Sequence, residues 1–527
     1  MNCLARRAAL WLLLFTGVLA ACPVRGQAQD IDELLQKARA AQSSGNYADA
    51  AGLYARAAQL SPSTPELWAN RGVMEYLAGR MEASTISLKH ALRLNPDLFT
   101  PMLFLGKAYV RLSKPAVALP WLSQAHTLKP ADVEVLLTLA KANADLNQQR
   151  QAASLYADTV RIAPENQAAW LGLGAASLEV ITVDGRALAA TAAQSIWAHS
   201  LYADELFAQG RPLEAVDTYM AATAAATPPQ KATLLRNLEW MRTHPDLFPI
   251  PTGSQQALLQ LMAQLESGQA IAGSPSCGHQ ATLIERAACA YWAGEYEQCA
   301  AKAGEQLHRS AQDPEALYWS VKASERLAVA AFARYEELAP QSATTYVMVG
   351  DLYRYRRQMD SALGEYRKAL SIDAHAPAAL LGTVVADLSA NKLEEAIVVD
   401  GIALADRPLD PQLNLLMAEI LAAENQFDQA RPYLEKCLSS PPELQSRVHY
   451  LLGRANAEDG NTEEAIHQFE LAMPADKDGS LHYQLSRLYR KVGKLAQAQQ
   501  AEQEAKVLIR HRDENAAIAV REATGHD

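Results

Sequence analysis

The chain has 527 residues, and single hydrophobic cores stop growing at roughly 250–300 residues, so it holds either several domains or one extended repetitive fold. Apolar residues make up 49% of the sequence and aromatic residues only 7%, a composition that packs helices well and makes poor strands. The net charge of −11 argues against nucleic-acid binding, which requires a basic surface.

The N-terminal segment, from Met1 to Ala28, differs from the rest of the chain. Arg6 and Arg7 precede a nearly apolar run from Ala8 to Ala20, which is shorter than the about 20 residues of a membrane-spanning helix. This pattern predicts a Sec-type signal peptide over residues 1–28 and therefore an exported protein.

The end of this segment has two interpretations. Leu19-Ala20-Ala21-Cys22 resembles a bacterial lipobox, in which the signal peptide ends at residue 21 and Cys22 is lipidated. Gly26-Gln27-Ala28 instead places small residues where an ordinary signal peptidase cleaves. The first predicts a lipoprotein anchored to a membrane through Cys22, and the second a soluble periplasmic or secreted protein.

A repeating pattern of small, aromatic and proline positions runs through most of residues 31–229, and its spacing is constant up to Pro164. Its positions are Gly45, Ala50, Tyr54, Ala57 and Pro62, then Gly79, Ser84, Leu88, Ala91 and Pro96, then Ala118, Leu122, Ala125 and Pro130, and then Ala152, Tyr156 and Pro164. Glycine suits the left-handed turn between two helices, and proline ends the second helix. Small residues let the paired helices approach closely; in the first helices they are Gly72, Gly106, Ala140 and Gly174.

The same pattern returns over residues 280–512, with Gly350, Tyr353, Ala362, Tyr366 and Ala369 as its clearest unit. These units resemble the tetratricopeptide repeat, a helix pair whose period of about 34 residues matches the spacing here. The resemblance implies an all-α, right-handed solenoid of helix pairs. It also implies that the concave groove binds segments of other proteins, without catalysis and without a cofactor.

Three segments depart from the period. Residues 167–195 and 314–342 are shorter than the usual unit, and their runs Trp170–Leu178 and Trp319–Leu327 resemble each other, which predicts two related arrays. Residues 230–279 lose the period and form a hinge, an insertion or a degenerate repeat pair, with helices expected over Leu234–Met241 and Ser254–Glu266. Residues 513–527 are expected to end a polar capping helix and form a tail.

The cysteines suggest one crosslink. Cys277, Cys289 and Cys299 lie close together in the sequence, and an exported protein is expected to join two of them in a disulfide. Cys437 occupies a small-residue position and is expected to be a buried, inert thiol.

No motif for metal, nucleotide or nucleophilic chemistry emerges. The run Gly172–Ser177 approaches G-x-G-x-x-G, but it lacks the third glycine and lies inside a predicted helix. We therefore expect no cofactor, no metal and no enzymatic activity. An enzyme with a site built by residues 230–279 is the alternative, without a positive indication.

A basic, tyrosine-bearing surface is the best candidate for a partner-binding groove. It combines first-helix residues of the last repeats, namely Arg447, Tyr450, Arg454, Tyr483, Arg487, Arg490 and Lys491. Such a surface suits an acidic segment or a C-terminal carboxylate of a partner. The alternative is an ordinary solvated face balanced by the nearby Glu458, Glu463 and Glu464.

These features predict a protein-binding scaffold or adaptor in the bacterial cell envelope, whose partners are proteins or peptides rather than nucleic acid. The alternative is an accessory factor for outer-membrane or exopolysaccharide assembly, anchored through a lipid on Cys22.

Overall fold

The computed structural model describes residues 23–191, 194–208, 211–224, 226–245, 252–267, 277, 281–355, 358–476 and 478–524. Cys22 and most of the predicted signal peptide lie outside these residues. Within the described ranges the chain is helical and has no strand, which confirms the predicted all-α fold of helix pairs. The chain divides into two compact units, and the boundary in the sequence falls between Leu338 and Ala339.

The helices of the first unit are α1 (Pro23–Ser43), α2 (Tyr47–Leu60), α3 (Pro65–Leu77), α4 (Met81–Leu94), α5 (Phe99–Arg111), α6 (Pro115–Leu128), α7 (Val133–Asp145), α8 (Gln149–Ile162), α9 (Gln167–Thr191), α10 (Ile196–Ala208), α11 (Pro212–Ala224), α12 (Pro228–Thr243), α13 (Thr252–Ser267), α14 (Leu283–Trp292), α15 (Tyr296–Arg309) and α16 (Pro314–Leu338).

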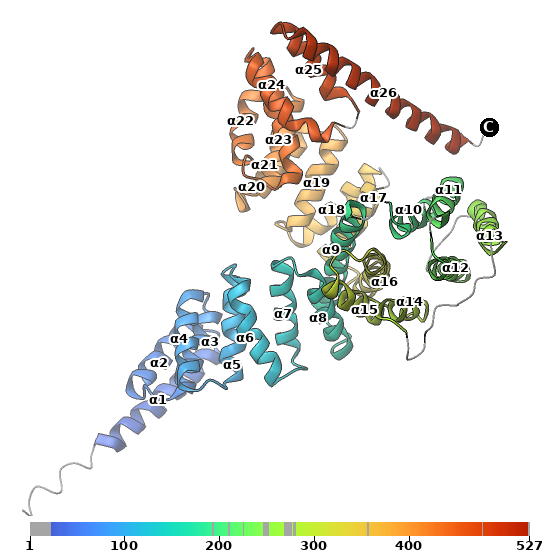
Figure 1. Ribbon diagram of the computed structural model, residues 1–527. Coiled ribbons are helices and arrows are strands. Elements are labelled where there is room, and N and C mark those ends of the chain that lie inside the picture. Colours follow the sequence, from blue (N-terminus) through green and yellow to red (C-terminus); the bar gives the residue numbers. More distant parts are fainter. Residues whose placement is uncertain are drawn as a thin grey trace, which may run out of the picture. The chain divides into compact units, whose positions relative to one another are not determined.

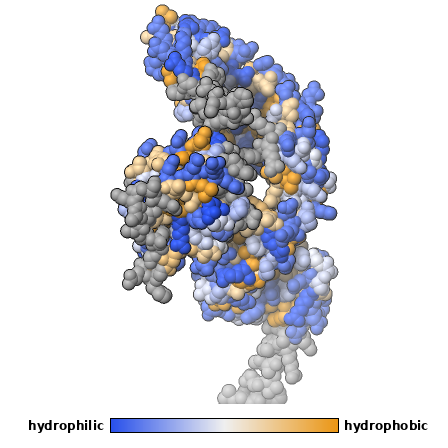
Figure 2. Space-filling view, turned by 90° about the vertical axis from the view of Figure 1, so that its right-hand side faces the viewer, coloured by the Kyte–Doolittle hydropathy of each residue, from blue (hydrophilic) through white to orange (hydrophobic). Residues whose placement is uncertain are grey.

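The helices of the second unit are α17 (Ala343–Tyr355), α18 (Met359–Ile372), α19 (Pro377–Ser389), α20 (Leu393–Asp406), α21 (Pro411–Ala423), α22 (Phe427–Lys436), α23 (Pro442–Glu458), α24 (Thr462–Ala472), α25 (Ser480–Lys491) and α26 (Leu495–Thr524), with the 3-10 helix η1 at Met473–Ala475. No helix among the described residues is both long and apolar enough to cross a membrane. On the face drawn in Figure 2, hydrophobic residues are scattered between hydrophilic ones.

The turns inside the helix pairs use residues with a left-handed backbone. Gly45, Gly79, Ser113 and Asn147, which occupy the same position in successive repeats, have φ values of 75°, 78°, 54° and 58°. At Gly79 the amide of Arg80 donates to the carbonyl of Glu75 at 2.8 Å, which caps the end of α3. The predicted glycine turns are confirmed, and serine and asparagine replace glycine in two of these repeats.

Two helices lack such a turn and are therefore long. The repeat spacing would place turns at Ile181 and Ala328, but both residues lie inside helices of 25 residues, α9 and α16. A branched side chain and an alanine disfavour the left-handed backbone, and no glycine or proline follows directly to break either helix. The shorter units expected over residues 167–195 and 314–342 are each mainly one long helix.

A five-helix block is repeated in the chain at a fixed shift in residue number, which we call the duplication shift. Four successive helices of each copy start at equivalent positions. The pairs of first residues are Gln149 of α8 and Tyr296 of α15, Gln167 of α9 and Pro314 of α16, Ile196 of α10 and Ala343 of α17, and Pro212 of α11 and Met359 of α18. The ends of α7 and α14, at Asp145 and Trp292, keep the same shift. This register aligns Gly172 with Trp319, so the sequence-based match of Trp170 with Trp319 was out by two positions.

Local hydrogen bonds repeat with the same shift. Asn166 accepts a bond from the amide of Ala169 at 2.9 Å, and its equivalent Asp313 accepts one from Ala316 at 3.1 Å. Likewise the Tyr219 hydroxyl donates to Asp204, and the Tyr366 hydroxyl donates to Asp351. Repeated contacts of this kind, together with the constant shift between the starts of four successive helices, indicate an internal duplication without insertions or deletions between those starts.

The two long helices pack side by side and antiparallel in the first unit (Figure 1). At one end Gln167 Nε2 donates to the carbonyl of Leu338 at 3.1 Å, and further along Ser320 Oγ donates to Asp184 at 2.6 Å. Gly174 faces Phe332 of α16, so its small size serves contact between the copies rather than contact inside one repeat. Gly72 behaves as predicted, because a Cβ there would lie 2.6 Å from Leu88 Cγ of the paired helix.

The segment between the two copies contributes to the core of the first unit. Its described residues form α12 and α13, close to the two expected helices, and Leu234, Leu238 and Leu261 are buried with the core of α14 and α16. Asn237 Nδ2 donates to the Tyr318 hydroxyl at 2.7 Å, which ties α12 to α16.

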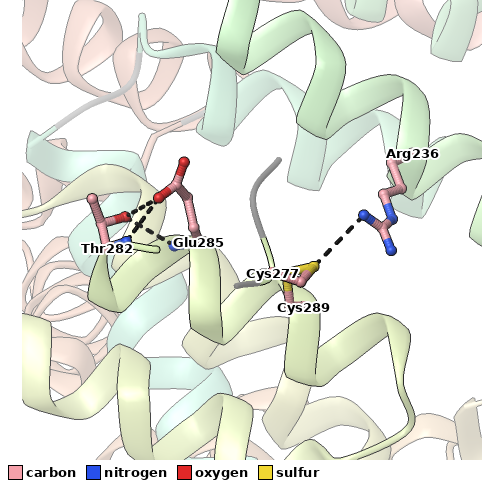
Figure 3. Close-up of a disulfide and its surroundings, with 5 residues drawn as sticks. All are labelled: Arg236, Cys277, Thr282, Glu285 and Cys289. Atoms are coloured by element: carbon pink, nitrogen blue, oxygen red, sulfur yellow. Dashed lines mark hydrogen bonds between the residues drawn. A yellow bond between two sulfur atoms is a disulfide. The ribbon is translucent and has the colours of Figure 1, made fainter. Parts of the chain in front are cut away.

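One disulfide joins two cysteines of the predicted trio. Cys277 is bonded to Cys289 and thereby attaches the chain preceding α14 to that helix (Figure 3). The helix itself starts at a capping box, in which the Thr282 hydroxyl and the Glu285 carboxylate cap each other's amides. Cys299 is a buried free thiol, and Cys437 is buried as expected.

Candidate functional site

The predicted groove residues lie on the first helices of the last repeats. Arg447, Tyr450 and Arg454 are on α23, and the other four are on α25. Arg447 forms a two-pronged ion pair with Glu419 of α21, with 2.7 Å between Arg447 Nε and the carboxylate. Because α21 and α23 are both first helices, this pair shows that neighbouring first helices share one face.

Four of the seven predicted residues already contact other side chains of the same chain. Arg447 is paired with Glu419, and Arg490 forms an ion pair with Glu502 of α26. The guanidinium of Arg454 lies 5.1 Å from the centre of the Phe427 ring. Tyr450 is half-buried, with its ring centre 6.0 Å from that of Phe469. The carboxylates that balance Arg447 and Arg490 are therefore not the three glutamates suggested by sequence proximity.

The remaining three residues form one exposed strip, which we call the α25 strip: Tyr483, Arg487 and Lys491. They are spaced four residues apart, so they lie above one another on one face of the helix. Tyr483 is 51% exposed. Neither Arg487 nor Lys491 forms an ion pair within the described part of the chain, so the strip offers two cations and a phenol to a partner.

A second polar cluster, not predicted from the sequence, is buried in the first unit. Lys322 Nζ of α16 lies 2.9 Å from Asp204 Oδ2 of α10, and the two side chains are 1% and 3% exposed. The hydroxyls of Tyr219 and Tyr318 also donate to Asp204, the latter at 3.1 Å. Glu325 lies nearby, with an oxygen 3.6 Å from Lys322 Nζ.

The electrostatics of this cluster keep Lys322 charged. Burial alone lowers the pKa of a lysine, but Asp204 and Glu325 outweigh burial and raise the pKa of Lys322. Burial in turn raises the pKa of Glu325, and the positive charge of Lys322 opposes that shift. Burial beside Asp204 raises the pKa of Tyr219 and Tyr318 well above the usual value, so both hydroxyls remain donors.

A sequence pattern does mark this cluster in retrospect. Lys322 is the one basic residue in the run Ala316–Ser324, which is otherwise free of charge, so it faces a core along with its neighbours. Its partner is on another helix, however, and nothing in the local pattern identifies Asp204. Among the described residues, no group of three His, Cys, Asp or Glu side chains is arranged to hold a metal ion. The near-motif at Gly172–Ser177 lies within α9, where Gly172 faces Tyr156.

Comparisons with known proteins agree with the fold. Residues 35–98 and 415–480 match the family model described as tetratricopeptide repeat. No curated protein matches the chain.

Several solved structures are similar to parts of the chain. YrrB, described as a TPR protein with an unusual peptide-binding site, is 22% identical over 35% of this chain and 97% of its own, with a TM-score of 0.29. MamA from Desulfovibrio magneticus RS-1 is 22% identical over 32% and 97%, with a TM-score of 0.30. The APC/C hetero-tetramer Cut9–Hcn1 is 14% identical over 92% and 88%, with a TM-score of 0.31. These structures are too distant from this chain to indicate its function.

Proposed function

We propose that this chain, in which residues 35–98 and 415–480 match the tetratricopeptide-repeat family model, acts as a non-enzymatic scaffold or adaptor in the bacterial cell envelope that binds a partner segment on the α25 strip. The main observation behind this proposal is that the α25 strip is exposed and positively charged. Arg487 and Lys491 are exposed cations one turn apart, whereas Arg447 and Arg490 are already paired. Two such cations beside a tyrosine suit an acidic segment or a terminal carboxylate, which accepts charge-assisted hydrogen bonds from both.

Affinity capture from the envelope fraction of the native host tests this function. The wild-type chain is compared with Arg487→Glu/Lys491→Glu, which reverses both charges, and with Arg487→Lys/Lys491→Arg, which keeps them. A partner that binds through the strip is retained by the wild type and by the charge-preserving variant and lost by the reversed one. Equal recovery by all three proteins contradicts binding at the strip.

Two features support the envelope location. Residues 1–28 have the pattern of a signal peptide, and the Cys277–Cys289 disulfide suits an oxidising compartment, because such bonds are rare in the cytosol. Trapping thiols with an alkylating agent in intact cells tests the second point. Cys277 and Cys289 are expected to resist alkylation until a reductant is added. Full alkylation without reductant contradicts an oxidising location.

A lipid-anchored accessory factor for outer-membrane or exopolysaccharide assembly is the second candidate, favoured by the lipobox-like Leu19–Cys22. It predicts that the protein incorporates radiolabelled palmitate and that Cys22→Ala abolishes the label. A wild-type protein without label, cleaved after residue 28, supports the soluble form instead.

A further inference from the structure

A pocket of about 600 Å³ opens in the first unit between α9, α10 and α16. Its walls are largely apolar, with Ile181 and Leu188 from α9, Leu201 from α10, and Val321 and Val329 from α16. None of its lining residues belongs to residues 230–279, where an enzymatic site was considered from the sequence, or to the α25 strip.

The internal duplication explains why this space is open. The duplication shift makes α9 and α16 equivalent helices, and the two pack antiparallel against each other. Each contact between a residue of α9 and a residue of α16 therefore has an equivalent contact, in which each residue is replaced by its counterpart in the other copy. The contact of Gly174 with Phe332 maps onto Val321 with Gly185, and these last two residues both line the pocket.

The two equivalent places differ in what fills them. At Gly174 an added Cβ would lie 2.6 Å from the Phe332 ring, so that side chain occupies the space. At Gly185 an added Cβ meets nothing within 4 Å. The pocket is therefore the place where the other copy holds a phenylalanine, and its hollow has room for one aromatic ring.

The charged part of the pocket favours a cation. Asp204, Glu205 and Glu325 contribute three carboxylates, and Lys322 and Arg326 contribute two cations, so the lining carries one excess negative charge. Asp204 and Lys322 are bound to each other in the core, whereas the Glu325 side chain is 31% exposed and sits 3.6 Å from Lys322 Nζ. A positive group brought to Glu325 restores neutrality in a partly dry site.

We propose that this pocket is a second binding site, which takes an aromatic side chain of a partner peptide between Gly185 and Val321 and pairs an adjacent lysine or arginine with Glu325. The aromatic ring gains apolar burial in place of the missing phenylalanine, and the neighbouring cation fixes its orientation. This site is specific for basic-aromatic sequences, whereas the α25 strip suits acidic ones. Failure of one binding proposal therefore does not contradict the other.

The test uses acetyl-Phe-Lys-amide as the probe and acetyl-Phe-Glu-amide as its charge-reversed match, with binding to the full chain detected by saturation-transfer NMR of the phenylalanine ring protons. The lysine peptide is expected to bind at least five-fold more tightly than the glutamate peptide. Gly185→Phe fills the pocket and is expected to abolish the signal, whereas Gly185→Ala, its matched control, retains it.

Glu325→Gln keeps the length of the side chain and removes its charge, so it separates the effect of charge from the effect of shape. It is expected to bring the two peptides to equal affinity without loss of ring contact. The proposal is overturned if the lysine peptide gives no signal, if Gly185→Phe binds it as the wild type does, or if Glu325→Gln leaves the preference for lysine unchanged.

Discussion

The buried ion pair between Lys322 and Asp204 gives the most demanding prediction. Replacing Lys322 with methionine keeps the length of the side chain and removes its charge. Asp204 then remains in the core without a cation, because its side chain is only 3% exposed. Breaking a buried pair from one side typically costs about 3–5 kcal/mol.

The surroundings place the expected loss at the lower end of that range. Asp204 still accepts hydrogen bonds from Tyr219 and Tyr318, which stabilise its negative charge. We therefore expect Lys322→Met to destabilise the first unit by about 3 kcal/mol, which corresponds to a roughly 100-fold larger population of locally open molecules. Adding Asp204→Asn removes the stranded charge and is expected to restore about 2 kcal/mol.

The chain contains its own reporter for this experiment. Cys299 is a buried thiol next to α16, with its Sγ 3.7 Å from the carbonyl of Trp319, and it reacts only when this region opens. Cys437 is buried in the second unit and serves as the internal control. Native-state thiol labelling, read by peptide mass spectrometry, is expected to accelerate about 100-fold at Cys299 and not at Cys437. Unchanged labelling of Cys299, or equal acceleration at both thiols, contradicts a stabilising role of the Lys322–Asp204 pair in the first unit.

Three further changes have defined outcomes. Burial raises the pKa of Asp400, whose two oxygens have no partner among the described residues, to about 7. Because the folded state binds this proton more tightly than the unfolded state, the free energy of unfolding falls as pH rises from about 4 to 7. In urea unfolding, Asp400→Asn is expected to add about 2 kcal/mol of stability at pH 8 and nothing at pH 4. Gly106→Leu forces its helix away from Leu122 and is expected to cost about 1–3 kcal/mol in thermal unfolding. Cys277→Ser opens the crosslink to Cys289 over a separation of 12 residues and is expected to cost about 3 kcal/mol in urea unfolding.

Each of these has a matched control. Gly52→Leu adds the same side chain to a helix where nothing lies within 4 Å, so it is expected to cost little, and an equal loss at both glycines means that overpacking is not the cause. A reductant should lower the stability of the wild type to that of Cys277→Ser and leave the variant unchanged. A pH-independent effect of Asp400→Asn contradicts the raised pKa.

The repeat turns could be read from the sequence because they depend on local backbone preferences. Gly45 and Gly79 adopt the left-handed conformation that the pattern assigns to them. The long helices α9 and α16 could also have been recognised, since Ile181 and Ala328 occupy turn positions and disfavour a turn. Their packing against each other was not predictable in the same way, because it depends on contacts between distant parts of the chain.

The candidate site was predicted less completely for the same reason. Exposure of Arg487 and Lys491 follows from the helix period, which the sequence contains. The pairing of Arg447 with Glu419 joins neighbouring repeats, and nothing in either helix alone selects that partner. The Asp204–Lys322 pair joins α10 to α16 across the core, so its members appear in the sequence as unrelated charges.

Site-specific photocrosslinking in the native host tests the scaffold function most directly. A photoreactive residue replaces Tyr483, which is 51% exposed on the α25 strip, or Leu471, which is 44% exposed on α24, a second helix of the same unit. We expect a discrete crosslinked partner from position 483, lost when Arg487→Glu/Lys491→Glu is added, and none from position 471. No crosslink from position 483, or the same products from both positions, would contradict a binding scaffold that uses this strip.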